Sequence, residues 1–444
     1  MNITNRRCRV RRGDGPWLEA VGASLASQLP PGAFPLRAAI VEVAGDEAVM
    51  EATVVELTAA DRYRDRFADV ALYAPRHTVP AAGPFAVVHV VPTGVRCEIG
   101  GFAGDACPAT NLLAAAADVL ITHPNAVNAS DLNEMAANVL YVEGKSLDDF
   151  LLGHLALVPA RGNRIGTFVD PSGRAHLDAV VNALGAARAA AGIDCGTYTL
   201  ARAEIGIQTA WTPSGCAVGT IAHPDVILDA VEALIAHGAQ AVGGVSVIHG
   251  VTAAEFTRHL DGRLPNPSGG IEAIVTHLVS AAFRIPAAHA PLPYYHDRKE
   301  KSTRNPRAAA EFISDPHYLS VLKGLSRAPR LVPLAELTGV PATAVSVNDV
   351  GAVVLPATCL GGVPALCADF NDIPIVAVAD NATLLDVTNA KMRMRNVVAV
   401  RSYPEAAGVV LALRHGISLE SLRRPLAVAA PIEAPAERPV PIGA

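Results

Sequence analysis

The feature that most constrains the fold is a unit that recurs along the chain: a short apolar strand, a Gly or Pro turn and an alanine-rich helix. The strands predicted at 85–91, 119–122 and 164–170 are apolar without alternation, which is typical of strands covered on both faces. Because strands alternate with helices, we expect an α/β fold of mainly parallel sheets flanked by helices.

Three of these units share a longer pattern, in which a glycine turn precedes a helix and a polar residue ends the next strand. They are Gly269-Gly270 with His289, Gly361-Gly362 with Asn381, and Gly100-Gly101 with His123. The pattern is compatible with degenerate strand–Gly turn–helix–strand repeats. Ordinary α/β folds reuse the same order of elements, so both interpretations stay open.

Shifts in composition suggest four segments. We expect an N-terminal α/β subdomain at 1–84, a central α/β domain at 85–300 and a C-terminal α/β domain at 301–424. The Pro/Ala-rich residues 425–444 are typical of a disordered tail. The most charged stretch, 293–312, is predicted to be a long loop, either a lid or a contact surface.

Composition excludes several classes of function. With 444 residues, 51% of them hydrophobic, the chain can bury a large core. A net charge of −6 and few aromatic residues argue against nucleic-acid binding. Seven scattered cysteines without a C-x-x-C pair favour a reducing, cytoplasmic location. Short, interrupted apolar runs predict no membrane span, and the sequence leaves a homo-oligomer open.

Polar residues that follow predicted strands are the main site candidates, because α/β sheets bind ligands beyond the carboxyl ends of their strands. Glycine turns at helix starts can add free backbone N–H groups for an anion. The candidates are His123, Asn125, Asn128, His289 and Thr358 at strand ends, with Gly100, Gly101, Gly104, Asp105, Gly269, Gly270, Gly361 and Gly362 in glycine-rich turns.

Other motifs give weaker signals. Ser214, Cys216 and His223 are close in sequence, but no G-x-S-x-G nucleophile elbow occurs, so we expect Ser214 to bind substrate at most. Arg327 is a candidate to bind an anionic group. No H-x-H, H-E-x-x-H or paired-cysteine metal motif and no dinucleotide fingerprint occurs, so no cofactor is predicted; a metal ion would need distant histidines to converge.

A set of motifs resembles, in the same order, a family known only as a domain of unknown function. These motifs include "IGGFAGDACP", "ITHPNAVN", "YVEG", "WTPSGCAVGTI", "PSGGIEAIVTHLV", "FRIPAAHAP", "GLSRAP" and "NDVGAVVLPATCLGG", and the resemblance spans about residues 85 to 390. The family is widespread in cyanobacteria and plastids and occurs in other bacteria. The resemblance implies shared motifs at Gly100, Gly101, Gly104, Asp105, His123, Asn125, Ser214, Gly269, Gly270, His289 and Arg327, but it implies no activity. The insert at 292–312 and the "VSVIHG" segment differ from the family.

These observations favour an enzyme acting on a small anionic polar metabolite, by hydrolysis or elimination at a C–N or C–O bond. His123 or His289 would act as general acid or base, and Asp105 would orient a histidine or receive a proton. Glycine-turn amides and Arg327 would hold the anionic group. The alternatives are a metabolite-binding or regulatory protein without catalysis, and an assembly partner that uses the 293–312 loop.

Overall fold

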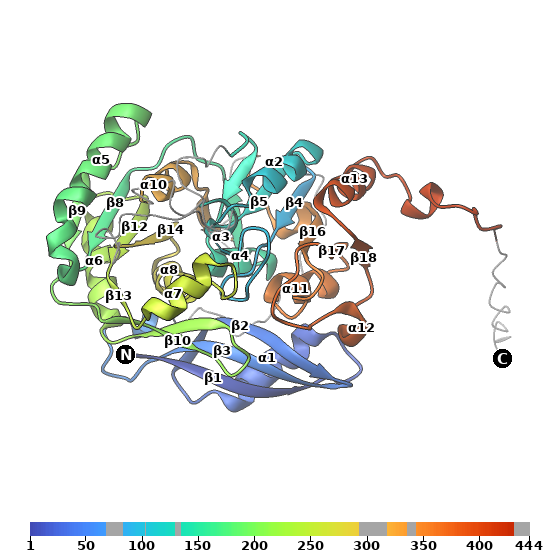
Figure 1. Cartoon of the computed structure of the whole chain (residues 1–444), viewed down its shortest axis with the longest axis horizontal. Coiled ribbons are helices and arrows are strands. Elements are labelled where there is room, and N and C mark those ends of the chain that lie inside the picture. Colours follow the sequence, from blue (N-terminus) through green and yellow to red (C-terminus); the bar gives the residue numbers. More distant parts are fainter. Residues whose placement is uncertain (68–82, 103, 129–134, 293–317, 335–342, 430–444) are drawn as a thin grey trace, which may run out of the picture.

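The computed structural model describes residues 1–67, 83–102, 104–128, 135–292, 318–334 and 343–429 (Figure 1). Two parallel sheets, covered by helices, confirm the predicted α/β class. The charged loop predicted at 293–312 and residues 430–444 of the predicted tail lie outside the described residues. None of the described helices is long and apolar enough to cross a membrane.

The larger sheet has six parallel strands in the order β18-β17-β16-β4-β5-β6. Their bounds are β4 Ala86–His89, β5 Val119–Thr122, β6 Val139–Tyr141, β16 Val350–Pro356, β17 Ile375–Val378 and β18 Val397–Val400. Because β16 lies between β17 and β4, the sheet combines strands from the segments predicted as central and C-terminal domains. The predicted boundary near residue 300 therefore does not separate two sheets.

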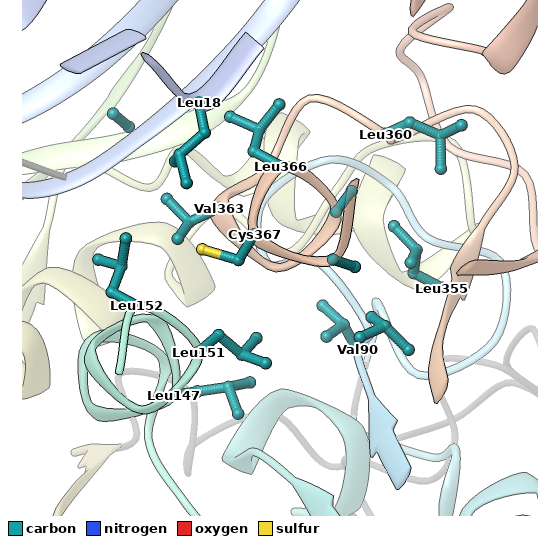
Figure 2. Close-up of a cluster of buried hydrophobic side chains, with 14 of the residues drawn as sticks. Leu18, Val90, Leu147, Leu151, Leu152, Leu355, Leu360, Val363, Leu366 and Cys367 are labelled. Carbon is teal, nitrogen blue, oxygen red and sulfur yellow. The ribbon is translucent and has the colours of Figure 1, made fainter. Parts of the chain in front are cut away.

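Helices cover both faces of this sheet. On one face α2 (Cys107–Ala116) and α13 (Tyr403–Arg414) share a buried cluster with the strands. On the other face lie α4 (Gly144–Leu151) and α11 (Val363–Phe370). Figure 2 shows Leu147 and Leu151 of α4 in one apolar cluster with Leu366 of α11 and Leu18 of the N-terminal segment. Burial on both faces explains why the strand sequences are apolar without alternation.

The smaller parallel sheet has the order β14-β12-β8-β9. Its strands are β8 Ile165–Val169, β9 Thr197–Leu200, β12 Ala241–Ser246 and β14 Ala287–Pro291. Helices α5 (Leu177–Ala191) and α10 (Tyr318–Arg327) cover one face, while α6 (Pro224–Ala236) and α8 (Gly269–Phe283) cover the other. The remaining strands form two short sheets, β11-β10-β13 (Ala217–Ile221, Ile207–Trp211, Ile248–His249) and β15-β7 (Arg330–Pro333, Leu155–Val158).

The N-terminal segment differs from the predicted α/β subdomain, because its sheet is antiparallel. Strands β1 (Asn2–Arg11), β3 (Glu47–Glu56) and β2 (Ala33–Ala44) pair in that order, and helix α1 (Trp17–Gln28) packs on the sheet. The turn at Gly45-Asp46 joins β2 to β3 directly, and a turn this short permits only an antiparallel pair.

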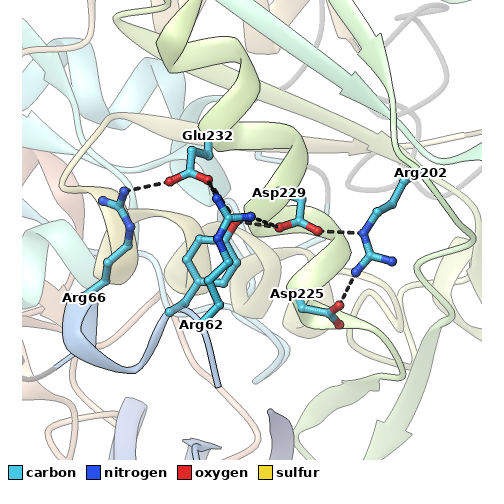
Figure 3. A network of polar contacts seen from close by, with 7 residues as sticks. Arg62, Arg66, Arg202, Asp225, Asp229 and Glu232 are labelled. Carbon is cyan, nitrogen blue, oxygen red and sulfur yellow. Dashed lines mark hydrogen bonds and ion pairs between the residues drawn. The ribbon is translucent and has the colours of Figure 1, made fainter. Parts of the chain in front are cut away.

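Polar contacts join this N-terminal segment to the rest of the chain. Figure 3 shows Arg62 and Arg66 reaching Asp229 and Glu232 on α6, where Arg202 also binds Asp229. This network is exposed, so each of its ion pairs stabilises the fold only weakly. A buried contact lies elsewhere: the Glu51 carboxylate, 4% exposed, accepts hydrogen bonds from the Ser214 hydroxyl at 2.7 Å and the Ser214 N–H at 3.3 Å.

We expect Glu51→Gln to destabilise the protein by about 1–3 kcal/mol, because the charge-assisted bond to Ser214 is replaced by a neutral one in a buried place. Urea unfolding followed by circular dichroism measures the change. Glu47→Gln, at an exposed position of the same strand, is the matched control. Equal stability of the two variants would contradict the buried contact.

Candidate functional site

A cavity of about 270 Å³ lies where several elements converge. Its wall includes β2, the carboxyl ends of β4, β5 and β14, and the first turns of α4, α8 and α11. Strand ends and helix starts are where α/β proteins bind small ligands. The position of the cavity therefore makes it the candidate site.

Eight of the fifteen candidate residues line this cavity. They are Gly104, His123, Asn125, Asn128, Gly269, Gly270, His289 and Gly362. His123 and His289, from the ends of two different sheets, thus share one cavity. The Asn125 amide also donates to the Val91 and Pro92 carbonyls at 3.1 and 3.3 Å, and Asn128 accepts from the Tyr141 hydroxyl at 2.8 Å.

The remaining candidates have positions outside the cavity wall: Gly100, Gly101, Asp105, Ser214, Arg327, Thr358 and Gly361. Asp105 accepts from the Gly100 N–H at 2.9 Å and so closes the glycine turn. Burial raises the pKa of Asp105. Its place in the turn, away from the cavity, gives it a structural role rather than the predicted proton-transfer role.

The other five positions also make structural contacts. Arg327 is exposed and donates to the Met135 and Ala136 carbonyls at 3.3 Å. The Thr358 hydroxyl lies 2.9 Å from that of Thr383. A side chain at Gly361 would come within 2.1 Å of the Ile40 carbonyl oxygen, so this glycine permits close backbone packing. Ser214 binds Glu51, as described above, and Gly101 packs against the Cys97 backbone.

His123 follows β5 as the residue before α3 (Pro124–Val127), and its hydrogen bonding fixes its tautomer. Nε2 accepts the Val91 N–H at 3.0 Å, so in the neutral ring the proton is on Nδ1. Burial lowers the pKa of His123 to about 4, which keeps the ring neutral near pH 7. A ligand would therefore meet His123 as an Nδ1–H donor, a narrower role than the predicted general acid or base.

His277 and Glu143 form a second polar group at the cavity. Glu143 caps α4 and accepts the Ser146 and Lys145 N–H groups at 2.5 and 3.0 Å, as well as the Ser280 hydroxyl. His277 Nε2 lies 3.7 Å from Glu143 Oε2, while its buried Nδ1 has no partner among the described residues. Burial, helped by the charges of Arg37 and Lys145, lowers the pKa of His277 to about 3.

Asp148, one turn further along α4, also lines the cavity. Burial raises the pKa of Asp148 well above its usual range, against the smaller opposing effects of Lys145 and Arg37. Lys145 itself is paired with Asp149. Asp148 is thus a carboxyl group that keeps its proton to a higher pH than an ordinary aspartate.

A chain of hydrogen bonds runs from the cavity into the smaller sheet. Glu272, in the first turn of α8, lines the cavity, and its Oε2 lies 3.4 Å from His289 Nδ1. His289 Nε2 lies 2.7 Å from the Ser246 hydroxyl at the end of β12. The chain is satisfied when Ser246 donates to Nε2 and Nδ1–H donates to Glu272. Ser246 is fully buried and lies outside the cavity wall, so it cannot meet a substrate as a nucleophile.

Sequence reasoning missed five charged or titratable cavity residues: Arg37, Glu143, Asp148, Glu272 and His277. Glu143, Glu272 and His277 lie inside motifs that were recognised, but on helix turns rather than at strand ends. The sequence around Arg37 gave no signal of a site, because the strand-end rule used for the prediction applies to parallel α/β sheets and Arg37 belongs to the antiparallel sheet. Within the described parts of the chain, no three His, Cys, Asp or Glu side chains are arranged to hold a metal ion.

Comparison with known families decides where the chain belongs. A family model described as "Protein of unknown function (DUF3326)" matches residues 86–423. The chain belongs to this family. It is also similar to an uncharacterised lipoprotein of a Synechococcus strain, with 34% identity over 344 residues that cover 76% of this chain and 92% of the relative. No solved structure matches the chain.

The family match covers only part of the cavity wall. The matched residues 86–423 include His123, Glu143, Asp148, Glu272, His277 and His289, whereas β2 and Arg37 lie before them. The DUF3326 part of the chain thus supplies the imidazoles and carboxyl groups, and the N-terminal sheet supplies an arginine.

Another buried histidine, His89, gives a test of the burial argument away from the cavity. Its ring lies between the Thr110 and Tyr403 hydroxyls at 3.1 and 3.2 Å, and burial lowers its pKa to about 3. The unfolded chain binds a proton at this residue near pH 6.5, whereas the folded protein does not. The contribution of His89 to stability is therefore lost as the pH falls from about 6.5 towards 3.

We expect His89→Gln to weaken the pH dependence of the unfolding free energy, by about 2 kcal/mol between pH 7 and pH 5. Urea unfolding at both pH values measures this. His415→Gln, at an exposed position, serves as control and should leave the dependence as in the parent protein. An unchanged slope for His89→Gln would show that the buried ring is protonated in the folded state.

Proposed function

We propose that the protein is an enzyme that binds a small anionic polar metabolite in the cavity and transfers protons at a C–N or C–O bond, by hydrolysis or elimination. The observation that carries the proposal is that acid–base groups in different environments line one cavity: Asp148, His123, and Glu272 with His289. Burial raises the pKa of the Asp148 carboxyl and keeps the His123 imidazole neutral, while the Glu272 carboxyl contacts a second imidazole. Together these groups form a proton-transfer set.

Asp148 is suited to be the general acid. A general acid must hold its proton at the working pH, and burial raises the pKa of Asp148 in the required direction. In this role it would protonate the leaving nitrogen or oxygen as the bond to carbon breaks. The Nδ1–H of His123 would donate a hydrogen bond to an oxygen that gains negative charge in the transition state.

Glu272 is suited to be the general base. It lies in the first turn of α8, where the helix dipole stabilises a negative charge. It would take a proton from a water molecule in hydrolysis, or from a carbon in elimination. His289 and Ser246 are positioning residues in this scheme, because they hold the Glu272 carboxylate through the chain at 3.4 and 2.7 Å.

The start of α8 is suited to the anionic part of the substrate. Its N-cap residue, Ser268, does not cap the helix with its side chain in the described structure. Gly270 lines the cavity, and a backbone N–H in this first turn can donate to an anion there. This supports the anion-binding role predicted for Gly270. It does not extend to Gly362, because the first turn of α11 contains Pro364, which has no N–H, and the Ala365 N–H donates to the Gly362 carbonyl. Arg327 lies outside the cavity wall.

We expect Asp148→Asn to lower kcat by 10²–10⁴-fold with little change in substrate affinity, because the amide cannot give up a proton. A panel of small anionic metabolites, incubated with the purified protein and followed by mass spectrometry, identifies the substrate. Steady-state kinetics and calorimetry then compare the variants. Asp386→Asn, at an exposed side chain, is the matched control.

The pH profile sharpens this test. In the parent enzyme, activity should fall as the pH rises through the raised pKa of Asp148, and Asp148→Asn should lack that limb. Unchanged turnover in Asp148→Asn would refute the assigned acid. A metabolite that binds in the cavity of the parent protein but is never converted would support the non-catalytic alternative.

We also propose a cytoplasmic location. All seven cysteines are free and buried, which suits a reducing compartment. The Synechococcus relative is named a lipoprotein, and that name would favour a membrane location instead. Fractionation of cells that produce the full-length protein should place it in the soluble cytoplasmic fraction. Recovery of a lipid-modified form with the membranes would contradict this.

A further inference from the structure

We propose that Arg37, supplied by the N-terminal sheet, is the residue that selects substrates carrying a carboxylate or phosphate group. The inference rests on the proposed function, in that the cavity must bind a metabolite. It goes further by assigning recognition to a part of the chain that lies before the family match, and by naming the oxyanion as the recognised group.

Arg37 is the only Lys or Arg among the described residues of the cavity wall. No hydrogen bond and no ion pair joins its guanidinium to another described residue. Two other arginines of this sheet are paired at the surface: Arg6 with Glu56 and Arg7 with Glu42. A guanidinium offers five N–H donors in a planar fork that matches a carboxylate or phosphate with two parallel hydrogen bonds.

The surroundings of Arg37 leave its charge uncompensated. Burial raises the pKa of Asp148 and outweighs the small lowering effect of the Arg37 charge, so that carboxyl stays protonated to a higher pH than usual. His277 is also kept neutral, in part by the Arg37 charge. An oxyanion entering the cavity would therefore find one permanent positive charge with no competing carboxylate on it.

The backbone of β2 turns Arg37 towards the cavity. Pro35 pairs with Val54 and Arg37 pairs with Thr53, so Leu36 is an extra residue that forms a β-bulge. Arg37 pairs with Thr53 and therefore lies on the side of Thr53 and Glu51. That side faces the core, as the bond between Glu51 and Ser214 shows. A second bulge, at Val41 between Arg37 and the turn at Gly45-Asp46, sets this register: if the pairing continued from the turn without that bulge, Arg37 would pair with Val54 and face the opposite side.

β2 is held firmly at this position. The Ile40 N–H donates to the Gly361 carbonyl at 2.9 Å, and Ala39 forms an isolated bridge with Gly362, the N-cap of α11. Helix α8 also packs against β2. Arg37 therefore lies on a strand that is held in place, in a cavity that the start of α8 also borders, and this helix start can add a backbone donor to the same anion.

The test uses inorganic phosphate and succinate as probes, with the full-length protein at fixed ionic strength. In calorimetry both parent protein and Arg9→Met, an exposed position on the same sheet, should bind at least one probe. Arg37→Met should bind it at least 10-fold more weakly, and Arg37→Lys should fall in between because the fork is lost. The probe that binds tells carboxylate from phosphate.

A second measurement on the unmodified protein guards against misfolding of the variants. An arginine-specific dicarbonyl reagent should modify Arg37, and the bound probe should protect it, as read by peptide mapping. Equal probe affinity in Arg37→Met and the parent protein, or no protection, overturns the inference. If the cavity binds and converts only uncharged metabolites, this inference fails while acid–base catalysis stands; if no metabolite is converted and none binds, the proposed function fails as well.

Discussion

Close contact between two backbones holds the cavity together. At Gly361 a side chain would meet the Ile40 carbonyl at 2.1 Å, and at Gly270 it would meet the Ala217 carbonyl at 2.0 Å. The first contact seats the N-terminal sheet on the start of α11, and the second seats the start of α8 on a neighbouring strand. Two glycines thus let these elements approach closely enough to enclose one space.

Burial is the common cause of the unusual charge states in that space. Removing a titratable group from water disfavours its charged form, so His123 and His277 lose affinity for a proton while Asp148 gains it. The cavity consequently holds neutral donors and acceptors in place of opposed charges. Among these neutral groups, the Arg37 guanidinium and the Glu272 carboxylate, which lies at the start of α8, are the charged groups that a ligand would meet.

The sequence was informative where one element determines a residue's place. Apolar strands without alternation predicted the parallel sheets, and the strand-end rule predicted His123 and His289 at one cavity. It was less informative on helix turns, where Asp148 and Glu272 reach the cavity through the packing of α4 and α8. Arg327 was assigned to the site from residue type alone, and the structure puts it on the surface. Arg37 depends on a contact between segments more than 300 residues apart, which no local pattern encodes.

The bulge at Val41 affects how relatives of this protein should be compared. The face on which Arg37 lies is set by this bulge and by the number of residues between Arg37 and the turn at Gly45-Asp46, and not by the identity of the side chain. A homologous sheet that keeps the bulge and has an arginine at the aligned position, but has one residue fewer before the turn, would direct that arginine to the side that carries α1. Where the bulge is kept, a one-residue gap in an alignment of this region would therefore indicate that the arginine has left the cavity. The ligand would then differ even where every charged residue is retained.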